Sequence, residues 1–150
     1  MAKMNSAVKF PFDASADKLL RAENAPALTA AATVDEAPVS LDCLTSYWDN
    51  ETVPHQSFAV VVNITDMDTT GDGNYDIKIQ TGNDEAMTST STQLSTDVTS
   101  RDTGVFALYL DVDTIKGRDP DACYIRISST ISGTTNLNLD YYAWIVPTAG

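Results

Sequence analysis

Residues 75–80 read YDIKIQ, and apolar and polar side chains alternate along this stretch without interruption. Successive side chains of a β-strand point to opposite faces of a sheet, so the pattern predicts a strand with one buried face and one wet face. Residues 123–128 (CYIRIS) repeat the pattern. Residues 58–64 (FAVVVNI) are apolar on both faces, which favours a central strand covered on both sides.

Short apolar runs of this kind recur between Gly, Asn, Asp and Pro residues from about residue 37 onward. The Ser- and Thr-rich residues 87–100 indicate an exposed edge strand and loop. With an eighth strand available in the N-terminal segment, the runs predict an all-β fold, a two-sheet antiparallel sandwich of jelly-roll type. The expected strands are Val39–Tyr47, Gln56–Thr65, Asn74–Gly82, Glu85–Gln93, Gly104–Asp111, Ala122–Ser132 and Asn136–Val146.

Residues 1–36 differ from the rest of the chain and are predicted to form an extended N-terminal arm, followed by the sandwich domain at 37–150. Residues 13–21 (DASADKLLR) favour a short helix, and residues 25–38 show no sustained period. Residues 1–24 carry four basic and three acidic side chains, whereas the remaining 126 residues carry five basic and 18 acidic ones. A near-neutral arm on an acidic body indicates docking on a neighbouring chain; a flexible terminus without a role is the alternative.

The arm supplies the candidate residues for binding a partner. Its sequence KFPFD holds two phenylalanines that the arm has no core of its own to bury, so we expect them to anchor in a pocket on another chain. The candidates are Phe10, Pro11, Phe12, Leu19, Leu20 and Arg21.

The composition excludes several classes of function. The 150 residues include nine Lys and Arg against 21 Asp and Glu, a formal net charge of −12, so the chain is not expected to bind nucleic acid directly. No apolar run approaches the roughly 20 residues of a membrane span, and the start MAKMNSAVKF lacks the apolar core of a secretory signal. We expect a protein kept in the cytosol, or one whose signal has been removed. Cys43 and Cys123 lie in apolar settings and are predicted to be core thiols, with a disulfide between them as the alternative.

The catalytic inventory is thin, which predicts a non-enzymatic protein without cofactors. The only histidine, His55, follows a proline in a loop-like stretch, and no serine sits in a nucleophile-elbow context. Residues 66–76 (DMDTTGDGNYD) resemble an oxygen-rich calcium loop, but no glutamate occupies the last position and the flanks are strands. A hairpin turn capped by aspartates is the favoured interpretation, and calcium is the alternative. The calcium candidates are Asp66, Asp68, Asp72 and Asp76.

Residues 140–146 (DYYAWIV) bring three aromatic side chains together near the C-terminal end. Alternation places Tyr142 and Trp144 on one face of the expected strand and Tyr141 on the other, so at least one of the two sets must enter the core. Tyr142 and Trp144 are therefore candidates for an aromatic interface patch, with a sugar-stacking platform as the alternative.

Three stretches together resemble the small jelly-roll cement or decoration proteins on the heads of tailed bacteriophages. They are residues 21–33 (RAENAPALTAAAT), the hairpin 69–84 (TTGDGNYDIKIQTGND) and residues 122–146 (ACYIRISSTISGTTNLNLDYYAWIV). The pattern is a strand ending in IKIQTGND, then a strand with Tyr and Arg, then a Ser-Gly-Thr turn at 132–134 into a final strand.

The resemblance implies a non-enzymatic protein on the outer surface of an assembled icosahedral shell. Such a protein bridges neighbouring major capsid subunits, acts as a homodimer or homotrimer, and is a virion component assembled in the host bacterial cytoplasm. Carried over to this chain, residues 1–36 would clasp neighbours. The competing hypotheses are a carbohydrate- or receptor-binding sandwich module with a structural calcium, and a hydrolase on the same scaffold.

Overall fold

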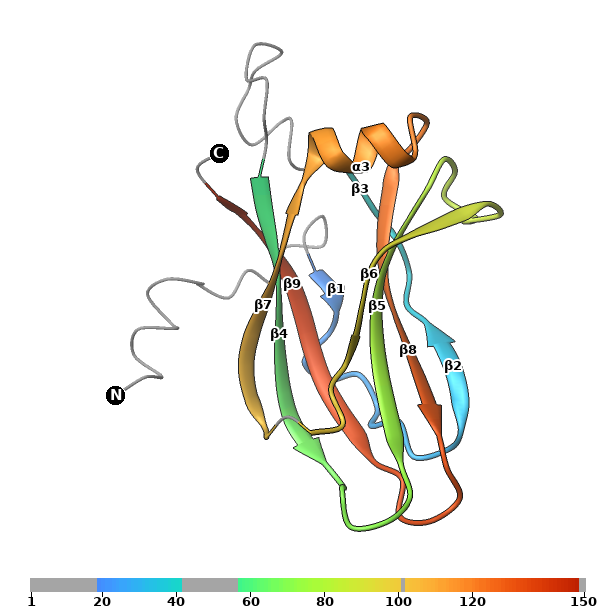
Figure 1. The fold of residues 1–150 in the computed structure, drawn as a ribbon, viewed down its shortest axis with the longest axis vertical. Coiled ribbons are helices and arrows are strands. Elements are labelled where there is room, and N and C mark those ends of the chain that lie inside the picture. Colours follow the sequence, from blue (N-terminus) through green and yellow to red (C-terminus); the bar gives the residue numbers. More distant parts are fainter. Residues whose placement is uncertain (1–18, 42–56, 101, 149–150) are drawn as a thin grey trace.

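The computed structural model describes residues 19–41, 57–100 and 102–148. These residues form two packed sheets with a short helix at one end (Figure 1). The elements are β1 (Leu19–Arg21), β2 (Ala32–Asp35), β3 (Val39–Ser40), β4 (Ser57–Met67), β5 (Asn74–Gly82), β6 (Thr90–Asp97), β7 (Gly104–Asp111), α3 (Val112–Arg118), β8 (Tyr124–Ser132) and β9 (Leu139–Thr148).

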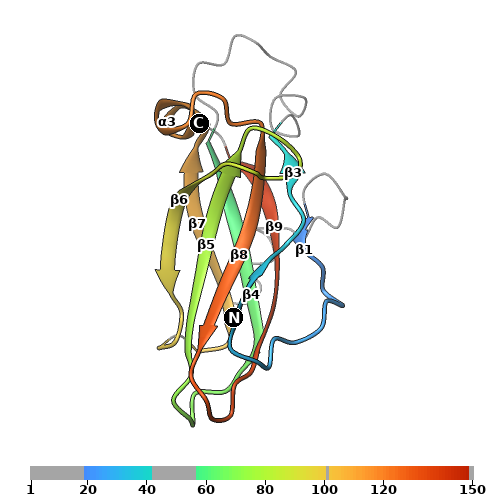
Figure 2. The same cartoon turned by 90° about the vertical axis from the view of Figure 1, so that its right-hand side faces the viewer.

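The strands pair in a nested order that defines a jelly roll. One sheet has the order β1-β9-β4-β7, and the other has the order β2-β8-β5-β6, with the short β3 also pairing with β8. Strands near the two ends of the chain pair with each other, β1 with β9 and β2 with β8. Strands from the middle of the chain also pair with each other, β4 with β7 and β5 with β6, and all four pairs are antiparallel. Figure 2 looks onto the β2-β8-β5-β6 sheet, with the other sheet behind it. The predicted sandwich of jelly-roll type is confirmed.

The core lies between the sheets and follows the period-two pattern. Tyr75, Ile77 and Ile79 of β5 are fully buried, while the side chains between them are partly exposed, as the alternation predicted. β4 lies between β9 and β7, and every side chain from Phe58 to Val62 is inaccessible to solvent. The prediction of a central strand covered on both faces is thereby confirmed.

The predicted boundary at residue 36 is wrong for the described part of the arm. β1 and β2 fall within residues 1–36, yet β1 pairs with β9 and β2 pairs with β8, so each sheet takes one edge strand from this segment. Leu19–Arg21 is also a strand, where the sequence favoured the end of a helix. Pairing with β9 decides the conformation of these three residues, because local helix propensity is a weak preference that tertiary contacts override.

The helix α3 was not predicted from the sequence. Asp111 caps its N-terminus, where the carboxylate accepts a hydrogen bond from the backbone N–H of Asp113 at 3.0 Å. Lys116 and Arg118 lie in the last turn, where their positive charge interacts favourably with the helix dipole. Ile115 is the buried residue of the helix. Cys123 differs from its prediction too, because it is exposed just before β8; Cys43 lies outside the described residues.

Candidate functional site

The outer face of the β1-β9-β4-β7 sheet carries a second apolar cluster, separate from the core. Along β9, Tyr141 and its alternate neighbours enter the core, while Tyr142 and Trp144 lie on the opposite face. Their rings stack with centroids 5.5 Å apart at an interplanar angle of 19°. The amide Nδ2 of Asn63 donates a hydrogen bond to the Tyr142 hydroxyl at 2.8 Å, which fixes the ring.

This outer-face cluster spans all four strands of the sheet. Its buried members and the partly buried side chains around them are Ala59, Val61 and Trp144, with Leu19, Ala107, Tyr142 and Val146. Trp144 is 3% exposed, so its indole is not an open platform for a sugar ring. Tyr142 and Leu19 lie at the accessible rim of the cluster. The structure thus brings the two predicted interface aromatics together with Leu19 of the predicted arm.

Leu20 and Arg21, which were predicted to bind a partner, are buried inside this chain. Leu20 belongs to the core cluster, and Arg21 is 3% exposed. The Arg21 guanidinium donates to the backbone oxygens of Tyr141 and Pro26, pairs with Glu36 at 3.2 Å, and lies 4.6 Å from the centre of the Tyr141 ring. Because all these partners belong to the same sandwich, Arg21 fastens β1 to β9 and to the segment after β2.

The ring of Tyr141 makes the cation–π contact with the Arg21 guanidinium. Burial raises the pKa of the Tyr141 phenol to about 12. The hydroxyl therefore stays neutral in the core across the physiological pH range, and the residue serves packing. Phe10, Pro11 and Phe12 lie outside the described residues, as does His55.

Two of the aspartates at 66–76, Asp66 and Asp72, accept hydrogen bonds from the β8–β9 loop. The Asp66 carboxylate accepts from the Asn138 side-chain amide at 2.8 Å, and Asp68 accepts from both the backbone and the hydroxyl of Thr70. Hydrogen bonds from Thr70 hold the pKa of Asp68 below its ordinary value. Among the described residues, which include all four calcium candidates with Asp76, no three acidic, His or Cys side chains converge to hold a metal ion.

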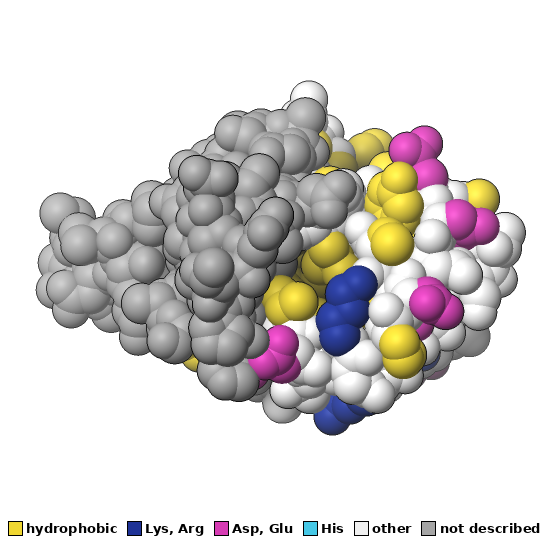
Figure 3. Space-filling view, turned by 90° about the horizontal axis from the view of Figure 1, so that it is seen from above, with side chains coloured by type: hydrophobic (Ala, Val, Ile, Leu, Met, Phe, Trp, Pro, Cys, Tyr) yellow, Lys and Arg dark blue, Asp and Glu magenta, His cyan; other side chains and the backbone are white. Residues whose placement is uncertain are grey.

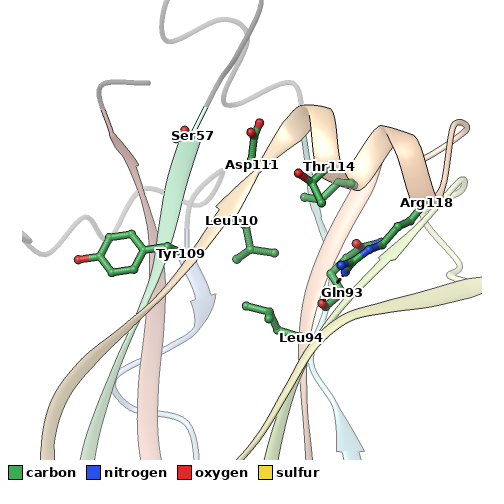
Figure 4. Close-up of a pocket in the computed structure, with 9 residues that line it drawn as sticks. Ser57, Gln93, Leu94, Tyr109, Leu110, Asp111, Thr114 and Arg118 are labelled. Carbon is green, nitrogen blue, oxygen red and sulfur yellow. Dashed lines mark hydrogen bonds between the residues drawn. The ribbon is translucent and has the colours of Figure 1, made fainter.

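A pocket opens at the edge between the two sheets, beneath α3 (Figure 4). Its volume is about 400 Å³, within the range of sites that take a small ligand or a few side chains. Seen from this end, apolar and basic side chains lie side by side on the described surface (Figure 3). The lining residues are Ser57, Gln93, Leu94, Tyr109, Leu110, Asp111, Thr114, Ile115 and Arg118.

Sequence analysis missed this pocket because its walls come from four separate elements. β4, β6, β7 and α3 each contribute, and only the fold brings them together. The local signal that was available is at Asp111–Arg118, where an acidic cap and a basic last turn predict a short helix.

Comparison with known protein families and with curated protein sequences finds no match for this chain. Within residues 19–41, 57–100 and 102–148, no helix has the length and apolar character needed to cross a bilayer.

Proposed function

We propose that this chain is a structural, non-enzymatic protein that binds the outer surface of a phage capsid and cements neighbouring major capsid subunits. In this proposal its partners are the major capsid protein and further copies of itself, as a homodimer or homotrimer. The protein is then a virion component that joins the shell in the bacterial cytoplasm, with no contact to nucleic acid or membrane.

The outer-face cluster is the observation that carries the proposal. An antiparallel sandwich needs only one apolar face per sheet, and the second face ordinarily meets water. Here the second face of the β1-β9-β4-β7 sheet holds the stacked pair Tyr142 and Trp144 within an apolar cluster. Aromatic side chains are enriched at protein interfaces, and the partly exposed Tyr142 and Leu19 are the members of the cluster that a partner can reach.

The acidic residues support a structural role over a catalytic one. In the described residues, the carboxylates of Asp68, Asp72 and Asp84 each accept hydrogen bonds from threonine backbone and hydroxyl groups in turns. These aspartates stiffen the loops. Rigid loops lose little conformational entropy when they bind, which favours a protein that must hold a lattice together. On a repeating surface, many modest contacts of this kind add up to tight retention.

A matched pair of tyrosine variants tests the proposal. Tyr142→Ser removes the ring that stacks on Trp144, whereas Tyr124→Ser removes a partly buried tyrosine on β8 of the other sheet. Each purified chain is added to shells stripped of the protein and sedimented with them. We expect Tyr142→Ser to bind about tenfold or more weakly and Tyr124→Ser to bind like the wild type. Equal retention of both variants, each folded by circular dichroism, would contradict the assignment of this face.

A further inference from the structure

The pocket beneath α3 has an apolar floor and sits where both sheets end in an edge strand. β6 and β7 are the outermost described strands on this side of their sheets. Figure 4 shows Leu94 of β6 and Leu110 of β7 pointing toward one another across the pocket, below α3. Ile115 of α3 is 1% exposed and joins the lining from above. An apolar side chain inserted between the two leucines would be enclosed by both sheets.

Gln93 places a buried hydrogen-bond acceptor in the pocket lining. The residue is 5% exposed, and its Nε2 donates to the Thr81 hydroxyl at 3.1 Å. That hydroxyl donates in turn to the Asp119 carboxylate at 3.2 Å, so it can only accept from Gln93, which fixes the orientation of the amide. The Gln93 Oε1 atom is then left buried without a partner among the described residues. A buried acceptor of this kind favours a ligand with an N–H or O–H donor.

The two ends of the pocket carry opposite charges. Asp111 lies at the N-terminal end of α3 and Arg118 at its C-terminal end (Figure 4). The seven residues of α3 separate these ends by roughly 10 Å at 1.5 Å per residue. Arg118 donates one hydrogen bond to the backbone oxygen of Gln93 at 3.0 Å, and its other guanidinium nitrogens can bind a carboxylate.

One segment of the chain matches this arrangement residue by residue. Residues 9–13 read KFPFD, with a cation, two phenylalanines around a proline, and then a carboxylate. We propose that Lys9–Asp13 of a second copy binds in the pocket, with Lys9 at Asp111, the phenyl rings at the leucines and Asp13 at Arg118. The proposal rests on the proposed function, because it names the site through which copies of a cement protein engage one another.

The segment also fits in length and backbone chemistry. Four residue steps of proline-favoured extended chain, at about 3.1 Å each, cover roughly 12 Å, close to the separation of the charged ends. Pro11 has no backbone N–H, but both phenylalanines do, and either N–H can satisfy the buried Gln93 Oε1. Burial of a rigid aromatic anchor with few rotatable bonds is a favourable way to hold a peptide in a pocket.

Geometry favours a second copy over the same chain. Leu19 pairs with Trp144, which in turn pairs with Val61 of β4. Val61 lies four residues along β4 from Ser57 in the pocket lining, and β1 lies three strands away from β7. These steps separate Leu19 from the near edge of the pocket by about 20 Å within the sheet. Six residue steps from Asp13 to Leu19 span at most about 20–22 Å. This length only reaches the near edge of the pocket, so Asp13 of the same chain cannot pass around β7 and reach Arg118.

Sedimentation velocity of the full-length chain over a concentration series tests the inference without any capsid. We expect the wild type to self-associate, and Phe10→Ser/Phe12→Ser to weaken the association about tenfold or more. Asp13→Arg and Arg118→Asp should each weaken it, and the double variant should restore it, since the two charges have exchanged places. Lys3→Asp, outside the segment, is the matched control and should associate like the wild type.

Mixing two defective chains separates a second copy from the same chain as the source of the segment. Phe10→Ser/Phe12→Ser keeps an intact pocket, and Arg118→Asp keeps an intact arm, so the mixture should form a mixed pair that neither variant forms alone. A monomeric wild type, or unchanged association of both variants, would overturn the inference. Because no shell is present, these outcomes leave the capsid-binding test above to succeed or fail independently.

Discussion

The carboxylate of Asp72 accepts hydrogen bonds from the backbone N–H groups of Thr134 and Thr135, each at 2.8 Å, across more than 60 residues of sequence. The Thr134 hydroxyl donates a third bond at 2.8 Å. Asp72 lies in the β4–β5 loop and the threonines in the β8–β9 loop, so one carboxylate ties together the connections of both sheets at the end opposite α3. These three hydrogen bonds form a clamp between the β4–β5 and β8–β9 loops.

The clamp predicts loss of stability in acid. Hydrogen bonds from Thr134 and Thr135 hold the pKa of Asp72 below its ordinary value of about 3.9. A lowered folded-state pKa adds stability that is present above the unfolded-state pKa and is lost as pH falls through the folded-state value. Urea midpoints should therefore show Asp72→Asn less stable than the wild type at pH 7, with the difference shrinking as the pH falls below the ordinary pKa and through the folded-state pKa. A difference that persists in acid would contradict this assignment.

Two glycine-to-alanine changes should shift stability in opposite directions. A Cβ at Gly71 would lie 2.0 Å from the backbone oxygen of Thr135, so the two loops would have to separate. We expect Gly71→Ala to destabilise by about 1–3 kcal/mol. Gly117 lies within α3, and a Cβ added there would meet no other atom within 4 Å, so Gly117→Ala should stabilise by up to about 1 kcal/mol. Thermal unfolding of the two variants measures both signs.

Removing the charge of Arg21 should be among the most damaging single changes in the described residues. Arg21→Met leaves the backbone oxygens of Tyr141 and Pro26 without their donor and Glu36 without its partner, at an expected cost of about 3–5 kcal/mol. Arg21→Lys should fall between this variant and the wild type, because an ammonium cannot reproduce the planar fork. Lys78→Met, on the wet face of β5, is the control and should stay within about 0.5 kcal/mol in urea unfolding.

Two truncations should separate the arm from the sandwich. A chain of residues 19–150 keeps every described strand and should still unfold cooperatively, with the far-UV circular dichroism of a β-sandwich. A chain of residues 37–150 lacks β1 and β2, which exposes apolar surface and unpaired edges on β9 and β8, so it should fail to fold cooperatively. A stable 37–150 fragment would show that the jelly roll does not need its first two strands.

The fold was predictable wherever one strand carries its own pattern. The alternation in YDIKIQ and the apolar run FAVVVNI each identify a strand and its position from a few residues, because burial on one or two faces leaves a direct trace in sequence. The strand Leu19–Arg21 has no such alternating or apolar pattern, since it is three residues long and its conformation depends on pairing with β9. Its misassignment to an external arm followed from that.

The candidate site was predictable only in part, for a similar reason. Tyr142 and Trp144 were identified because they alternate with core residues on one strand. The pocket was not, since Leu94, Leu110 and Arg118 come from three elements and no spacing in the sequence records their proximity. The roles of Arg21 and Asp72 likewise depend on partners 60 to 120 residues away.

The most direct test of capsid cementing is the molar ratio of this chain to the major capsid protein in particles purified from the source on a density gradient. Quantitative mass spectrometry gives that ratio. The account predicts a fixed value, the same across fractions and preparations, that corresponds to a dimer or trimer placed regularly on the shell. Absence of the chain from the particles, or a ratio that varies freely between preparations, would contradict it.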